Sequence, residues 1–269
     1  MKNILGETKW TTWRHRASPW LLGASLSLLA ACGSDSTSPG KVTGLGSVVV
    51  WGSTSMVFNG SSAFRRLLGD SGGGTDDYVL VRNILRHLAN KTSGVRILYT
   101  ETCDPRTALN LCRIASSMDF LQPFYDMIAT IGTITYGDMS LAHLSDYDVV
   151  IADFCYLPSS DYPVLRSYLS TGGFAMILAD NFCVPGSSSS AALANTVVAD
   201  LGVAFSNDEL YERGRLQIPS AARTGLLAGV YNLNMWRVAP QLISESFVPI
   251  VTFDTASNHY VLSAIQKRQ

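Results

Sequence analysis

Three apolar runs, each followed by a segment with helical periodicity, constrain most strongly what this chain can fold into. The runs read VRILYTE (95–101), YDVVIADF (147–154) and FAMILAD (174–180). Short apolar runs of this kind are typical of strands that are buried on both faces of a parallel sheet. Strands that alternate with helices predict an α/β protein with a mostly parallel sheet and helices on both faces.

The rest of the chain fits this pattern. Further strands are predicted at 47–53 and 133–138, and a C-terminal antiparallel hairpin within 246–266, on the edge of the sheet. Two helices have plausible N-cap residues: Asp76 for one, and either Ser160 or Asp161 for the other. Helices are predicted over 75–94, 107–117, 120–132, 159–173 and 188–202.

The first 31 residues have the features of an export signal. A basic segment precedes a run of 12 apolar or small residues from Trp20 to Ala31, which is too short to span a membrane. Leu29-Ala30-Ala31-Cys32 resembles the lipobox of bacterial lipoproteins, which implies cleavage before Cys32 and lipid attachment to it. Gly33 at the second position resembles lipoproteins passed to the outer membrane, facing the periplasm or the cell surface. Residues 32–46 are rich in Gly, Ser and Thr and are interpreted as a flexible tether.

Composition excludes some function classes for the remaining domain, residues 47–269. Without the first 31 residues the chain has 16 basic and 20 acidic residues, with no basic run of five or more, so nucleic-acid binding has no electrostatic support. Four cysteines follow Cys32 without CxxC spacing or nearby histidine clusters, which argues against a zinc site. In an oxidising compartment they are expected to form disulfides, for which three connectivities exist: Cys103, Cys112, Cys155 and Cys183.

The segment LSDYDVVIADF…LRSYLSTGGFAMILAD (144–180) resembles the class I glutamine amidotransferase-like superfamily, including its trehalose-utilisation-type domains. The resemblance implies a three-layer, flavodoxin-like fold. The piece from Ser47 to Ala89 resembles a segment that these domains carry at their C-terminal end. Its position here leaves two alternatives: a permuted strand order, or two adjoining copies of which the first is cut short.

A ligand site is expected at the carboxyl ends of the strands, where open parallel sheets bind their ligands. If the strand order is flavodoxin-like, the three apolar runs are neighbours and their tips converge. Carboxylate and amide oxygens there could bind a cation or a polar ligand, although such acids also cap helices. A glycan would instead stack on Tyr156, Phe182 and Trp236. The candidate binding residues are Glu101, Asp104, Asp153, Tyr156, Asp180 and Asn181.

An enzyme of the hydrolase or amidotransferase type is the alternative function, with Cys183 as nucleophile. The resemblance places the superfamily's catalytic cysteine close to this position. The glycines that flank that cysteine are replaced here by Phe182 and Val184, and the late His259 lacks the H-x-E spacing. A thiol nucleophile needs an oriented general base. The chain therefore resembles members without the catalytic set.

Disulfide formation is the competing hypothesis for Cys183. Pairing of Cys183 with Cys155 is favoured because both follow neighbouring strand ends, and Cys103 would then pair with Cys112. Such a bond would exclude thiol catalysis. The sequence thus predicts a membrane-anchored lipoprotein whose domain binds a small molecule, a glycan or a protein, with no metal or cofactor. A third reading is a fragment of a longer, multi-domain lipoprotein.

Overall fold

The computed structural model describes residues 45–53, 76–100, 118–140, 142–179, 190–207, 210, 215–234 and 238–267. All of them belong to one unit, which spans residues 35–269. The signal peptide, Cys32 and nearly all of the tether lie outside the described residues.

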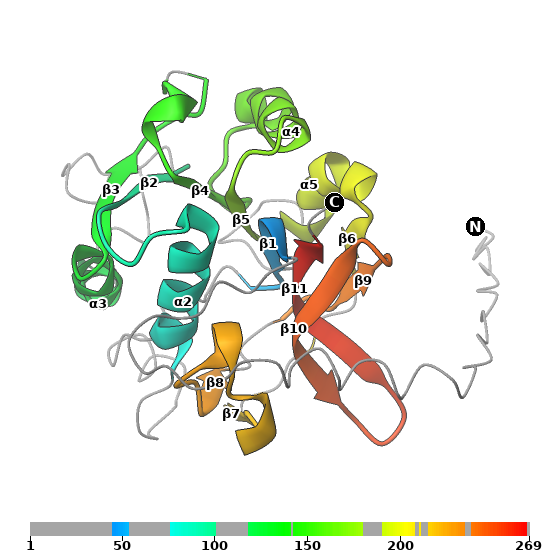
Figure 1. Cartoon of the computed structure of the whole chain (residues 1–269). Coiled ribbons are helices and arrows are strands. Elements are labelled where there is room, and N and C mark those ends of the chain that lie inside the picture. The colour runs from blue at the N-terminus through cyan, green and yellow to red at the C-terminus, as the bar shows by residue number, and fades with distance from the viewer. Residues whose placement is uncertain are drawn as a thin grey trace, which may run out of the picture. The chain divides into compact units, whose positions relative to one another are not determined.

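A nine-stranded mixed sheet forms the centre of the domain, in the order β3-β2-β4-β5-β1-β11-β9-β6, with β10 paired to β11 (Figure 1). The first five strands in this order are mutually parallel, and β11 runs antiparallel to β1. The strands are β1 (Leu45–Trp51), β2 (Val95–Tyr99), β3 (Gly132–Tyr136), β4 (Val149–Asp153), β5 (Ala175–Leu178), β6 (Val203–Phe205), β9 (Gln241–Ile243), β10 (Phe247–Asp254) and β11 (His259–Lys267).

Helices cover both faces of this sheet, as the sequence predicts. On one face α2 (Asp77–Ala89) and α3 (Met118–Ala129) contribute to one apolar cluster, and on the other α4 (Tyr162–Ser170) and α5 (Ser190–Val198) contribute to a second. Strand β4 shows the reason for its uninterrupted apolar sequence. Val149 and Ile151 belong to the first cluster, and Val150 and Ala152 to the second. The α/β class with a mostly parallel sheet is confirmed.

The C-terminal hairpin is also confirmed, and β10 is its outer strand, because β11 is the only described strand with which β10 pairs. Strand β11 lies inside the sheet, between β1 and β9, and β10 pairs with it in antiparallel register. The sequence does not predict the three-residue strands β6 and β9, which continue the sheet beyond β11. It also does not predict the small separate sheet of β7 (Arg215–Gln217) and β8 (Asn232–Asn234).

The two predicted helix caps have a different role. Asp76 and Asp161 occupy the N-cap positions of α2 and α4, but neither side chain makes a capping hydrogen bond. The Asp76 carboxylate accepts hydrogen bonds from the backbone N–H groups of Tyr231 and Asn232, at 2.8 and 3.0 Å. The buried Asp161 carboxylate accepts one from the N–H of Met139, at 2.6 Å. Backbone N–H groups of distant segments bond these carboxylates in place of the N–H groups at the helix ends. Asp76 and Asp161 therefore hold those segments against the helices.

Candidate functional site

The strands that were expected to present a ligand site are neighbours. Strand β4 pairs with β2 on one side and with β5 on the other, all parallel, so their carboxyl ends meet at one edge of the sheet. Asp153, Cys155 and Tyr156 are the predicted site residues that the structure describes, and all three lie at the end of β4. The other predicted residues lie outside the described residues and stay predictions: Glu101, Cys103, Asp104, Cys112, Asp180, Asn181, Phe182, Cys183 and Trp236.

Asp153 is a fully buried carboxylate that joins two strand ends. One of its oxygens, Oδ2, accepts a hydrogen bond from the hydroxyl of Tyr99 at the end of β2, at 2.9 Å. Its Oδ1 accepts a second from the backbone N–H of Cys155, at 3.0 Å. A buried carboxylate needs such donors, because burial of an unpaired charge is very costly. The geometry therefore makes Asp153 a link between β2 and the turn that follows β4.

A group of aromatic side chains packs around the ring of Tyr99, and the sequence analysis missed it. The ring of Tyr99 contacts those of Phe124 and Tyr136, with centroids 6.3 and 5.6 Å apart, and Tyr125 packs edge-on against Tyr136. The signal available in the sequence was an aromatic residue at the last position of β2 and of β3, Tyr99 and Tyr136. The Tyr99–Asp153 hydrogen bond next to these rings is buried, and a hydrogen bond is stronger away from water.

Cys155 is disulfide-bonded. It lies in a tight turn, in which the N–H groups of Tyr156 and Leu157 both donate to the C=O of Asp153, at 2.9 and 2.7 Å. Tyr156 is half-buried. The remaining cysteines of the chain lie outside the described residues, so the pairing with Cys183 stays a prediction. The sulfur of Cys155 itself is engaged in a covalent bond and is no free thiol.

His259 is a described histidine with an acid beside it, as a general base needs. His259 Nδ1 lies 2.5 Å from Asp254 Oδ1, across the turn of the β10–β11 hairpin. Both side chains are largely exposed, at 60% and 72%. A base with an orienting acid is part of a thiol site, but burial would be needed to make the pair strong. Its high exposure is typical of an ion pair at the tip of a hairpin.

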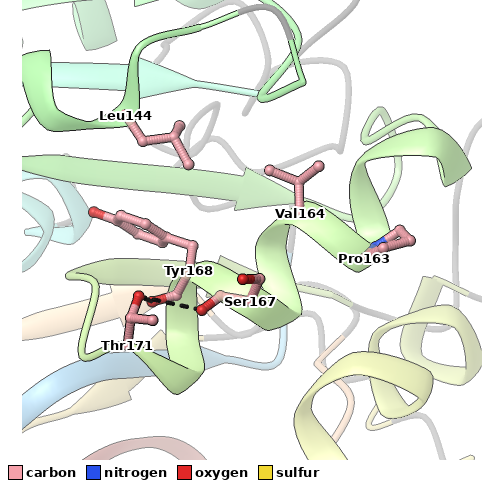
Figure 2. Close-up of a pocket in the computed structure, with 6 residues that line it drawn as sticks. All are labelled: Leu144, Pro163, Val164, Ser167, Tyr168 and Thr171. Carbon is pink, nitrogen blue, oxygen red and sulfur yellow. Dashed lines mark hydrogen bonds between the residues drawn. The ribbon is translucent and has the colours of Figure 1, made fainter.

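A cavity that is lined by described residues lies away from this edge. It has a volume of about 460 Å³ and is shallow, and Figure 2 shows its lining side chains on α4 and in the segment before β4: Leu144, Pro163, Val164, Ser167, Tyr168 and Thr171. Thr171 follows α4 and Leu144 precedes β4, so the cavity lies toward the amino ends of the strands.

Tyr168 supplies the main polar group of this cavity, and its position is fixed. Its hydroxyl is within 3.2 and 3.3 Å of the backbone N and O of Phe174. Its ring lies over Gly173, where a Cβ atom would come within 2.5 Å of the ring carbons. Burial raises the pKa of Tyr168, the hydrogen bond with Phe174 opposes this shift, and the charge of Asp148 adds to it. The side chain stays a neutral phenol that closes the end of α4, and nothing in this cavity indicates catalysis.

Among the residues that the structure describes, no group of three or more His, Cys, Asp or Glu side chains could hold a metal ion. In the same part of the chain, no helix is long and apolar enough to cross a membrane. No family model matches the chain, and neither a curated protein nor a solved structure matches it.

Proposed function

We propose that this chain is an exported lipoprotein, anchored through Cys32, whose α/β domain binds a ligand instead of turning one over. The anchor keeps the domain on the cell envelope, most simply on the outer membrane. The ligand is a small molecule, a glycan or a protein, and it binds at the carboxyl edge of the parallel strands. Nucleic acid has no electrostatic support as a ligand, because acidic residues outnumber basic ones after the first 31 residues.

The disulfide of Cys155 is the observation that carries this proposal. Disulfides persist in oxidising compartments and are rare in the cytosol. A disulfide within the α/β body therefore agrees with the export signal and lipobox that residues 1–32 indicate. The two observations are independent, because they come from different parts of the chain.

The strand order supports a permuted flavodoxin-like fold of the glutamine amidotransferase-like type. Flavodoxin-like sheets have the order 2-1-3-4-5. If β2 is counted as the first strand, β3-β2-β4-β5 reproduces 2-1-3-4, and β1 takes the fifth place. The faces agree too, because α2 and α3, which follow the fifth and first strands in this count, lie on one face and α4 and α5 on the other. This favours permutation over two adjoining copies.

The chemistry at the edge of the sheet supports binding over catalysis. Asp153 already accepts two protein hydrogen bonds in a buried place, and the sulfur of Cys155 is bonded. If its partner is Cys183, the candidate nucleophile is consumed, since a thiolate is the reactive form. The enzyme alternative requires instead that Cys183 is a free thiol.

Mass spectrometry of the full chain extracted from membranes tests both parts of the proposal. We expect an N-terminal peptide that begins at acylated Cys32, and no iodoacetamide label on the other four cysteines before reduction. Cys32→Ala should move the protein out of the membrane fraction, whereas Cys155→Ser should leave it there and expose one new thiol on the partner. An unmodified N-terminus would refute the anchor. Labelling of Cys183 in the unreduced wild type would refute the disulfide and favour the enzyme.

A further inference from the structure

Strand β3 ends the parallel side of the sheet, and no described strand pairs with its outer edge (Figure 1). The register shows which backbone groups face outward. The N–H of Val95 donates to the C=O of Ile131, at 3.0 Å, and the N–H of Gly137 donates to the C=O of Tyr99, at 3.3 Å. In a parallel pair the groups that face one neighbour alternate along the strand. Thr133 and Thr135 therefore bond to β2, and the N–H and C=O of Ile134 point away from the sheet.

The opposite end of the sheet shows how this fold protects an edge. Strand β6 has three residues, and the outward N–H and C=O of Phe205 are both paired with the side chain of Asn195 on α5, at 2.7 and 2.9 Å. The side-chain amide takes the place of another strand. Strand β3 has five residues and reads GTITY, with no charge, proline or bulge. Charges, prolines and bulges are devices by which edge strands avoid pairing with another chain, and β3 has none of the three.

We propose that β3 pairs antiparallel with β3 of a second copy of this chain, about a two-fold axis at Ile134, so that the two sheets become continuous. The sequence Thr133-Ile134-Thr135 reads the same in both directions, so a two-fold pair centred on Ile134 places identical residues opposite each other. Ile134 would face Ile134 of the second copy and exchange both backbone hydrogen bonds with it. This is the position whose N–H and C=O face outward.

The side chains fit this register. Thr133 of each copy would face Thr135 of the other, and Thr–Thr is a favourable cross-strand pair. Both threonines are exposed, because no α-helix lies between β3 and β4 to cover that face. Asp138 is the only charged residue within four positions of Ile134, and it would face Thr130, so no like charges meet. A neutral, self-complementary strand favours a second copy over a charged peptide as its partner.

Native mass spectrometry of the full chain, released from detergent micelles, tests this pairing. We expect the wild type to contain a dimer. Thr133→Glu/Thr135→Glu and Thr133→Lys/Thr135→Lys should each raise the dissociation constant roughly tenfold or more, since like charges then face each other twice. Mixing the two variants should restore a dimer with one copy of each, because Glu then faces Lys. Ala256→Glu/Ser257→Glu, in the exposed hairpin turn, adds the same charge far from β3 and should leave the dimer intact.

Ile134→Pro separates loss of pairing from loss of folding. It removes an N–H that faces outward, so the bonds of β3 to β2 stay, and an edge strand tolerates proline in that position. We expect a monomer with an unchanged circular dichroism spectrum. A monomeric wild type, including one that captures an unrelated extended peptide on β3, would overturn the proposal. So would a dimer that survives the Glu substitutions, or a Glu–Lys mixture that stays monomeric.

Discussion

Apart from the exposed Asp254–His259 pair at the hairpin turn, the described side chains that bond across the antiparallel part of the sheet are neutral. The parallel part also has a neutral bond, from the hydroxyl of Thr100 to the C=O of Ile151 at 3.1 Å, but it differs in having carboxylates that join its strands. On the antiparallel side, Asn195 pairs with Phe205, and the buried amide of Gln241 and hydroxyl of Ser263 donate to the C=O groups of Leu262 and Val50, both at 3.1 Å. On the parallel side, Asp153 joins β2 to β4 at their carboxyl ends, and Asp148 joins them at their amino ends.

This difference follows from the connectivity. Strands β10 and β11 are joined directly by a turn, so backbone pairing alone sets their register. Strands β2 and β4 are neighbours in space but are separated in the chain by α3 and β3. Side chains that reach from one to the other add the register information that no turn supplies. We therefore expect pH and salt to change the free energy of unfolding through the side-chain interactions of the parallel part.

Asp153→Ala should have the largest effect on stability. The buried hydroxyl of Tyr99 and the partly buried N–H of Cys155 would both lose this acceptor, which costs about 2–4 kcal/mol. The free energy of unfolding of the full chain in detergent, measured by urea titration with the disulfides intact, checks this. Asp153→Asn keeps one oxygen acceptor and should cost less. A loss below about 0.5 kcal/mol for the alanine variant would mean that the carboxylate does not hold the strands, and would favour a ligand-binding role for it.

Asn195→Ala should have an intermediate effect, about 1–2 kcal/mol, since the N–H and C=O of Phe205 both lose a partner. The better helix propensity of alanine in α5 offsets part of this loss. The variant also opens the second edge of the sheet, so native mass spectra should show species larger than the dimer. Asn195→Asp keeps the acceptor for the N–H and loses the donor to the C=O, and it should be intermediate. Full stability of the alanine variant would show that this edge needs no protection.

Much of the fold could be predicted because buried parallel strands have a distinctive sequence. The runs around Ile97, Ile151 and Ile177 are apolar on both faces, and all three strands were placed correctly and as neighbours. The three-residue strands β6 and β9 could not be predicted, because three residues show no periodicity. The carboxylates were the hardest part. Asp76 and Asp161 have the spacing of helix caps, and only the folded chain brings the N–H groups of Tyr231 and Met139 within reach to compete.

Of the candidate site, the edge of the sheet could be predicted and the roles of its residues could not. Strand alternation indicates where the carboxyl ends lie, and Asp153, Cys155 and Tyr156 are there. Nothing in the sequence shows that the hydroxyl of Tyr99 on β2 would reach Asp153 on the neighbouring strand β4, because the order of strands is a property of the whole fold. A buried acid at a strand tip thus has the same sequence pattern as a ligand-binding acid.

Asp148→Asn should have the smallest effect and the clearest dependence on pH. Partial burial raises the pKa of Asp148, but hydrogen bonds from Lys91 and from the N–H and guanidinium of Arg96, together with the charge of Lys91, outweigh it and lower the pKa from 3.8 to about 2. A carboxyl whose pKa is lowered by folding stabilises the protein above its unfolded pKa, and this contribution is lost as the pH falls through the folded value. Lys91 and Arg96 are 42% and 51% exposed, so solvent screening reduces the contribution to about 1 kcal/mol or less.

We therefore expect wild type and Asp148→Asn to differ in urea titrations at pH 7 and to converge between pH 4 and pH 2, and 0.5 M salt should reduce the difference at pH 7. Asn195→Ala is the matched comparison, because no charge is involved and its loss should be the same at pH 7 and pH 4 in either salt. If instead the Asp148 variant lost the same stability at every pH and salt concentration, this carboxylate would act through geometry alone. The parallel and antiparallel parts of the sheet would then be held by the same kind of interaction.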